Sequence, residues 1–296
     1  MPFLFRLAAR LPLSVLHALG AVLGWLVYAA SPTYRRRFKD NIRQAGVSAS
    51  QARRAIAEAG KLATELPWLW LRPPTEKLPL ISWQGDELLE AALAAGKGVI
   101  FMTPHVGSFE AVPQAFAARF SPKYGAMPIL YRPSKFKWLD DFLRAARSAP
   151  GMEPAPTTTA GVRMILKALK QGRVTGMLPD QVPGDGLGVW APFFGRPAYT
   201  MTLALRLARQ TGAPMLTALC DRLPGGRGYV VHVEPLTIPL DQGDEVAAAA
   251  LNIALEKVIL RRPGMYLWSY NRYKQPRAQV QVDAAAPSSP RAPPRR

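Results

Sequence analysis

Cysteine and histidine are nearly absent from this chain of 296 residues. The single cysteine, Cys220, excludes an intramolecular disulfide framework and a zinc site built from several cysteines. Because Cys220 stands inside an apolar run, we expect it to pack in the core. The chain has three histidines, His17, His105 and His232, too few to suggest a histidine-rich metal centre. It also lacks a Gly-x-Ser-x-Gly elbow and a Walker-type phosphate loop, which counts against a serine hydrolase or a kinase.

Acidic residues are scarce. Asp and Glu number 20 against 38 Lys and Arg, so the net charge is +18. A surplus of this size indicates an anionic partner, which can be a nucleic acid, an anionic lipid or an acidic protein. The surplus is spread along the chain and is not confined to the arginine-containing carboxyl terminus.

One long uncharged run lies near the amino terminus. Residues 11–30 contain no Asp, Glu, Lys or Arg, and about 20 apolar residues suffice to cross a bilayer. A basic stretch, 35–43, follows this run, which by the positive-inside rule places the rest of the chain in the cytoplasm. A cleaved signal peptide is the alternative, but the basic stretch argues against export. We therefore predict a transmembrane or obliquely inserted anchor over residues 1–40.

After the anchor, predicted strands and helices alternate. Short apolar runs predict strands at 80–83, 99–102, 126–131, 174–178, 214–219 and 229–234, and helical spacing predicts helices at 41–70, 86–95, 109–116, 136–148, 161–170, 199–211 and 245–260. This alternation is typical of an α/β domain with a mostly parallel sheet, which we assign to residues 41–275. The segment 276–296 is rich in Pro and Ala without a core-forming pattern, and we expect it to be disordered.

The stretch Lys97–Gln114 carries the strongest candidate for chemistry. A buried strand is expected to lead into a loop and then a helix, with His105 in the loop and Glu110 five residues later. A histidine held by a carboxylate keeps one tautomer and becomes a better general base. The spacing lets Glu110 reach back to His105 from the first turn of the helix. Taken alone the pattern is weak, because a structural histidine at a strand end is common.

Two further stretches carry polar residues suited to a ligand. Asp180 follows the predicted strand 174–178, where an acidic side chain is placed to contact ligand, although capping a turn is also a common role. The segment 131–148 contains Arg132 and Arg147 among several lysines and arginines that suit phosphate groups, or simply form a solvated helix face.

Several motifs, in order, resemble one known family. TPHVGSFE, the YRP and LDDFLRAARS segments, MLPDQ, PFFGRPAYT, LARQTGAP, GGRGY and PGMYLWSYNRYK match the lipid A biosynthesis acyltransferases, the lauroyl and myristoyl late acyltransferases of the lysophospholipid acyltransferase superfamily. The resemblance runs from the anchor to about Lys274. It implies a glycerolipid acyltransferase-like fold, a mostly parallel mixed sheet flanked by helices. It also implies a Gram-negative inner-membrane enzyme, single-pass or monotopic, with its catalytic domain in the cytoplasm.

The resemblance also implies roles for individual residues. His105 becomes the general base and Glu110 its orienting carboxylate, while Arg132, Arg147 and Asp180 fall on substrate-binding positions. The implied donor is an acyl carrier protein thioester and the implied acceptor a phosphorylated glycolipid. The remaining implied partner is the anionic inner-membrane surface. No cofactor, no metal and no nucleic acid is implied.

The residues agree with this chemistry. Acyl transfer to a hydroxyl needs a base, because an alcohol is a poor nucleophile near neutral pH. With His105 as that base, the acceptor can attack the thioester directly without a covalent acyl-enzyme. Other acceptors, such as a lysophospholipid, an ornithine lipid or a phosphoinositide mannoside, need the same chemistry. A non-catalytic basic membrane protein also explains the charge, but it has no use for His105, Glu110 and Asp180.

Overall fold

The computed structural model describes residues 2–131 and 150–277. Arg132 and the predicted basic helix 136–148, which contains Arg147, lie outside the described residues. The predicted tail does too, except for its first two residues.

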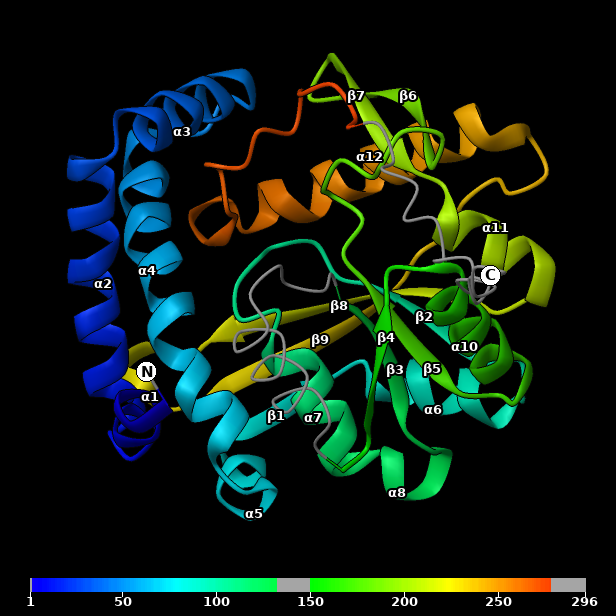
Figure 1. Ribbon diagram of the computed structural model, residues 1–296, viewed down its shortest axis with the longest axis horizontal. Helices are drawn as coiled ribbons and strands as arrows, with labels where there is room; N and C mark the ends of the chain where they lie inside the picture. The colour runs from blue at the N-terminus through cyan, green and yellow to red at the C-terminus, as the bar shows by residue number, and fades with distance from the viewer. Residues whose placement is uncertain (1, 132–149, 278–296) are drawn as a thin grey trace, which may run out of the picture.

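The described helices surround one large sheet (Figure 1). They are α1 (Pro2–Ala9), α2 (Leu13–Ala30), α3 (Pro32–Gln44), α4 (Ala49–Leu71), α5 (Pro74–Lys77), α6 (Asp86–Ala94), α7 (Ala111–Arg119), α8 (Ser121–Tyr124), α10 (Thr159–Lys170), α11 (Leu203–Thr211) and α12 (Gly243–Arg261), with 3-10 turns η1 (Leu78–Leu80), η2 (Pro224–Gly226) and η3 (Pro263–Met265). The strands are β1 (Ile81–Gln84), β2 (Val99–Met102), β3 (Met127–Tyr131), β4 (Met152–Pro156), β5 (Val174–Met177), β6 (Gly188–Phe193), β7 (Arg196–Met201), β8 (Met215–Arg222) and β9 (Tyr229–Pro235).

The main sheet has seven strands in the order β1-β9-β8-β2-β5-β3-β4. All neighbouring pairs are parallel except β8 and β9, so β1 and β9 run against the other five strands. The predicted α/β fold with a mostly parallel mixed sheet is therefore confirmed. β2 and β5 are neighbours although β3 and β4 separate them along the chain.

Each face of the sheet carries its own hydrophobic core. Within β2, Val99 and Phe101 belong to the core under α6 and α7, whereas Ile100 and Met102 belong to the core under α10, α11 and α12. This alternation follows from the period of two of a strand, and burial on both faces explains why β2 reads as a continuous apolar run. All four of its residues are fully buried.

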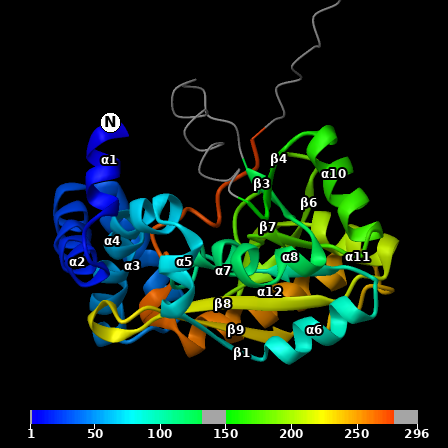
Figure 2. The ribbon, with the colours of Figure 1, turned by 90° about the horizontal axis from the view of Figure 1, so that it is seen from below.

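The amino-terminal helices form a layer beside one end of the sheet (Figure 2). Helix α4 contributes Ile56 to one core and Trp68 to the other. Trp68 is 2% exposed, so this tryptophan of α4 packs inside the protein.

Helix α2 packs closely against α4 along a line of glycines. A Cβ on Gly24 would lie 2.1 Å from the carbonyl oxygen of Ile56, and one on Gly60 would lie 1.9 Å from the carbonyl oxygen of Gly20. Side chains at these positions would force the two backbones apart. The opposite face of α2 is apolar and exposed. The exposed fractions of its side chains lie between 42% and 61% for Leu19, Val22, Trp25 and Leu26.

Two predictions of local structure need correction. The helix predicted at 41–70 is divided, because its first residues belong to α3 and α4 begins at Ala49. At the start of α3, the side chain of Ser31 accepts a hydrogen bond from the amide of Tyr34 (3.3 Å). The predicted helix 199–211 is partly wrong, because its first residues lie in β7, and the helix α11 begins at Leu203. β6 and β7 form a hairpin around Phe194 and Gly195, both with positive φ (46° and 73°). This two-residue turn suits hairpin twist, but its phenylalanine gives little warning of it in the sequence.

Candidate active site

The register of β2 and β5 brings His105 and Asp180 together. Met102 and Met177 are paired at the ends of these parallel strands, and His105 and Asp180 each follow three residues later. Parallel strands end at the same edge of a sheet, where the ligands of α/β proteins are usually bound.

The Asp180 carboxylate holds His105 at two points. Its Oδ1 lies 2.8 Å from Nδ1 of the ring, and its Oδ2 accepts the backbone N–H of His105 at 3.0 Å. With Asp180 ionised, Nδ1 carries the proton and Nε2 keeps its lone pair for a substrate. The Nε2 atom lies 2.9 Å from the side-chain amide nitrogen of Gln181.

The structure shows a carboxylate other than Glu110 beside the ring of His105, and the orienting role expected of Glu110 stays a prediction. The carboxylate at Nδ1 of His105 belongs to Asp180, which comes from a neighbouring strand and not from the helix after the loop. The half-buried Glu110 stands at the amino-terminal end of α7, and its Oε2 accepts a hydrogen bond from the indole of Trp70 (3.3 Å). Asp180, predicted as a substrate-binding residue, lies where a residue that orients the base is needed.

Electrostatics keep Asp180 ionised. Burial acts to raise the pKa of its carboxyl, but the charge and hydrogen bonds of His105 outweigh it and hold the pKa below the usual value. The nearby Tyr266 shows the opposite result, because burial and the charge of Asp180 raise the pKa of its hydroxyl well above 10. Asp180 is therefore the anion of the site and Tyr266 a neutral neighbour.

The His105 loop is held between β8 and the carboxyl-terminal segment. The amide of Leu267 donates to the carbonyl of His105 (3.1 Å), and the amide of Ser108 donates to the carbonyl of Cys220 (2.8 Å). Gly107 has a φ of +63°, and a Cβ there would lie 2.1 Å from the carbonyl oxygen of Cys220. Only glycine fits this close approach to β8.

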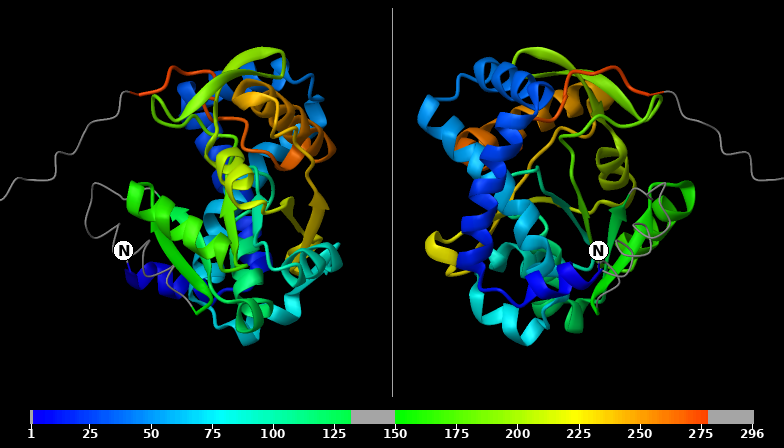
Figure 3. Two further views of the ribbon diagram at one scale, coloured as in Figure 1. Left: turned by 90° about the vertical axis from the view of Figure 1, so that its right-hand side faces the viewer. Right: turned by 60° about the vertical axis from the view of Figure 1, so that its left-hand side comes forward.

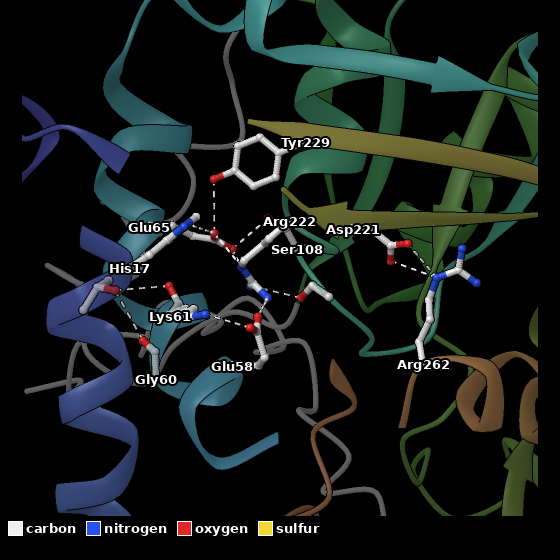
Figure 4. Close-up of polar contacts among 12 residues, drawn as sticks. His17, Glu58, Gly60, Lys61, Glu65, Ser108, Asp221, Arg222, Tyr229 and Arg262 are labelled. Atoms are coloured by element: carbon white, nitrogen blue, oxygen red, sulfur yellow. Dashed lines mark hydrogen bonds and ion pairs between the residues drawn. The ribbon is translucent and has the colours of Figure 1, made fainter. Parts of the chain in front are cut away.

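A buried ionic network contacts the same loop through Gly107 and Ser108 (Figure 4). Glu65 of α4 is fully buried and accepts hydrogen bonds from Arg222 of β8 (2.6 and 2.8 Å), Ser108 (2.7 Å) and Tyr229 (3.1 Å). His17 of α2 contacts the same carboxylate at 3.1 Å. Through Ser108, the network joins the apolar amino-terminal helix to the loop that carries His105.

Arg222 completes this network. It contacts Glu58 at 3.0 Å and donates to the carbonyl of Gly107 at 3.1 Å. Burial acts to lower the pKa of its guanidinium, but Glu65 and Glu58 raise it above the usual value. Both members of the Glu65–Arg222 pair are therefore charged. The one hint of this network in the amino-acid sequence is His17, a histidine within the otherwise apolar run 11–30.

Two pockets adjoin the loop. A polar cavity of about 490 Å³ is lined by His105, Asp180 and Gln181, by the beginning of α3 and by the segment 266–277. A second pocket is mainly apolar, and Glu110 and Thr103 stand in it among Phe109, Ile129 and Met177. His105 and Glu110 thus line different pockets of the described structure.

The site residues inferred from the sequence lie in three different places. The structure brings His105 and Asp180 into contact and places Glu110 in the adjoining pocket. Arg132 and Arg147 lie outside the described residues, so their roles stay predictions. Gln181 was missed as a site residue, although it stands next to Asp180 in the MLPDQ motif.

Comparison with known proteins identifies the family. The profile described as "Bacterial lipid A biosynthesis acyltransferase" matches residues 2–275, nearly the whole chain. The lipid A biosynthesis lauroyltransferase of Escherichia coli is 26% identical over 285 residues, which cover 90% of this chain and 88% of that protein. The palmitoleoyltransferase of the same organism is 28% identical over 280 residues, covering 90% and 87%. Its myristoyltransferase is 24% identical over 216 residues, covering 72% and 65%. With its His–Asp pair at the carboxyl ends of β2 and β5, the chain belongs to the bacterial lipid A biosynthesis acyltransferase family.

Proposed function

We propose that this protein transfers a fatty acyl chain from an acyl carrier protein thioester to a hydroxyl group of a lipid A precursor. The observation that carries the proposal is the His105–Asp180 pair at the wall of a polar cavity, in a chain that belongs to this family along almost its whole length. The relatives named above are lauroyl-, palmitoleoyl- and myristoyltransferases.

In this mechanism, Nε2 of His105 takes the proton of the acceptor hydroxyl while Gln181 moves aside from the ring. The acceptor oxygen attacks the thioester carbonyl carbon, and the carbon–sulfur bond breaks as the tetrahedral intermediate collapses. The thiolate of the carrier leaves and receives the proton from His105. Asp180 stabilises the imidazolium during both transfers and holds the ring in place.

Direct transfer is favoured over an acyl-enzyme. Cys220 is the only cysteine in the chain, its side chain is fully buried, and burial raises the pKa of its thiol well above 9. A buried thiol of this kind is a poor nucleophile. The hydroxyl of the acceptor is therefore the nucleophile that His105 activates.

The apolar pocket beside the loop suits the beginning of the transferred acyl chain. Its methionines, Met127, Met152 and Met177, have flexible side chains that can adapt to a hydrocarbon. Glu110 stands in the same pocket, and its catalytic role remains a prediction of the His-x4-Glu pattern. Arg132 and Arg147 remain the predicted phosphate-binding and substrate-binding residues.

The amino-terminal helices support a location at the membrane. Within the described residues, α2 is the helix long and apolar enough to cross a bilayer, with a mean hydropathy of 1.8. We assign its exposed apolar face to the lipid and the excess positive charge of the chain to attraction by the anionic surface of the inner membrane. The catalytic domain then faces the cytoplasm, where acyl carrier protein is available.

Mass spectrometry of lipid A from cells with and without the protein tests the function. We expect one acyl chain fewer when the protein is absent, and restoration by the wild type but not by His105→Ala. Purified protein should use acyl carrier protein thioesters, and acyl-coenzyme A serves as the comparison donor. Unchanged lipid A together with a mass change in another lipid would instead identify a different acceptor, such as a lysophospholipid.

A further inference from the structure

Hydrogen bonds join two walls of the polar cavity next to His105. One wall is the beginning of α3, and the other is the carboxyl-terminal segment 266–277. Asn41 of α3 donates from its side chain to the carbonyls of Trp268 (2.6 Å) and Tyr270 (2.9 Å). Both walls also lie near the β6–β7 hairpin, at the top of each view in Figure 3. The cavity is therefore built into the fold and does not depend on the arrangement of one loop.

The cavity has a marked excess of positive charge. Arg37, Lys274 and Arg277 line it, and none of the three forms an ion pair within the described ranges. Lys274 lies over the ring of Tyr270, with its Nζ atom 4.8 Å from the ring centre. Among the described residues that line the cavity, Asp180 is the only one with a carboxylate, and both of its oxygens already contact His105. Two planar guanidinium groups and one ammonium form a set that suits a phosphate group.

The remaining lining combines hydroxyl and amide groups with aromatic rings and one leucine, a mixture that suits a sugar. Hydroxyl and amide groups from Ser31, Thr33, Ser269 and Asn271 face a volume that suits a phosphorylated sugar. The rim at Ser31 follows directly on the last residue of α2, whose exposed face is apolar. A glycolipid can therefore keep its chains beside α2 while its head group enters the cavity.

We propose that this cavity binds the phosphate-bearing sugar of the acceptor lipid, with Arg37, Lys274 and Arg277 holding the phosphate and a hydroxyl of the sugar facing His105. The assignment rests on the proposed function, because it takes a phosphorylated glycolipid as the acceptor. It adds a phosphate site formed by α3 and the carboxyl-terminal segment to the contact already predicted for Arg132. The soluble acyl carrier is not the ligand of this cavity, because the rim adjoins the face of α2 that we assign to lipid.

Acyl transfer by the full-length protein tests the phosphate site. The acceptors are a phosphorylated lipid A precursor and the same lipid after treatment with phosphatase. We expect Arg37→Gln and Lys274→Gln each to lower kcat/KM for the phosphorylated acceptor about tenfold, since a lost hydrogen bond to a charged group has this size of effect. On the dephosphorylated acceptor the variants should match the wild type, and the KM for the acyl carrier should not change.

Arg36→Gln is the matched control. Arg36 is the exposed neighbour of Arg37 on α3 and does not line the cavity, so this variant loses the same charge near the membrane without touching the site. It should behave like the wild type with both acceptors. Equal losses in Arg36→Gln and Arg37→Gln, equal losses with both acceptors, or a changed KM for the acyl carrier would overturn the phosphate site.

A binding measurement separates this proposal from the proposed function. The His105→Ala protein should bind vesicles that contain the phosphorylated precursor, and adding Arg37→Gln should weaken that binding about tenfold. If the wild type transfers no acyl chain but this difference persists, the phosphate site stands and the proposed function fails. If Arg37→Gln weakens the binding of inorganic phosphate but not of the vesicles, the cavity takes free phosphate and the head-group assignment is wrong.

Discussion

At the scale of single residues, the candidate site depends on a carboxylate that comes from a different part of the chain than its histidine. Asp180 binds both the ring and the backbone amide of His105, so it fixes the tautomer and the position of the loop together. This double contact makes Asp180 a positioning residue whose charge also stabilises the imidazolium.

Asp180→Asn should lower kcat by about 10⁴-fold with little change in the acceptor KM. The amide can donate to Nδ1 and so favour the wrong tautomer of His105, while the size of the side chain is kept. Steady-state kinetics of the purified protein would measure this loss, and circular dichroism would confirm that the variant is folded.

Glu110→Gln is the comparison. This variant keeps an oxygen that accepts from Trp70, so a lower kcat would report the charge of Glu110 and not its packing. We expect it to be impaired too, as the His-x4-Glu pattern predicts. Near-normal activity of Asp180→Asn beside an inactive Glu110→Gln would contradict the assignment of Asp180 as the partner of the base.

At the scale of elements, the Glu65–Arg222 pair joins α4 to β8 next to the loop that carries His105. Removing one member of a buried ion pair leaves the other charged and unpaired, which typically costs about 3–5 kcal/mol. Arg222→Met should therefore lower the free energy of unfolding by about 3 kcal/mol or more in urea denaturation of the protein in detergent. Arg261→Met is the control, because Arg261 pairs with Glu234 at the surface and should contribute less than about 1 kcal/mol. Equal losses in both variants would refute the importance of the buried pair.

The same pair predicts how stability depends on pH. Burial acts to raise the pKa of Glu65, but Arg222, His17 and Ser108 together bring it to about 2, below its usual value of 4.5. A lowered carboxyl pKa stabilises the folded state fully above its unfolded value, and this contribution is lost as the pH falls through the folded value. The difference in unfolding free energy between wild type and Arg222→Met should thus shrink from about pH 4.5 toward about pH 2. A difference that stays constant over this window would contradict the pKa assignment.

At the scale of the whole molecule, α2 is part of the fold as well as the helix that we propose to contact the membrane. Its glycines touch α4, and its His17 enters the buried network. If α2 crossed the bilayer, the neighbouring part of α4 with Glu58 and Lys61 would enter the hydrocarbon. Each charged residue there costs about 2.5–3.5 kcal/mol or more. We therefore expect α2 to lie along the membrane surface with its exposed face in the lipid.

Labelling of Arg10→Cys distinguishes the two orientations. Arg10 is exposed just before α2, and the native Cys220 is fully buried. A surface orientation keeps residue 10 on the cytoplasmic side, so a membrane-impermeant maleimide should label the variant only after spheroplasts are lysed. Gln242→Cys, in an exposed loop of the catalytic domain, is the control for the cytoplasmic side. Labelling of Arg10→Cys but not of Gln242→Cys in intact spheroplasts would show that α2 spans the membrane.

Local patterns determined most of the elements. The apolar run of β2, the helical spacing of α4 and the uncharged run of α2 are all visible in the sequence, because burial and helix periodicity are local in the chain. These patterns also singled out His105 and Asp180 as residues after strand ends. The hairpin of β6 and β7 was not foreseen, because its Phe-Gly turn departs from the usual turn residues.

Only the tertiary structure decided which residues meet. The sequence spacing paired His105 with Glu110, the nearest carboxylate along the chain. The strand order instead places β5 beside β2, so Asp180 reaches the ring from 75 residues away. Likewise, α3 and the carboxyl-terminal segment enclose one cavity although most of the chain separates them. Strand order depends on how whole layers pack, and no local pattern in the sequence encodes it. The contact between His105 and Asp180 could therefore be identified only in the folded protein.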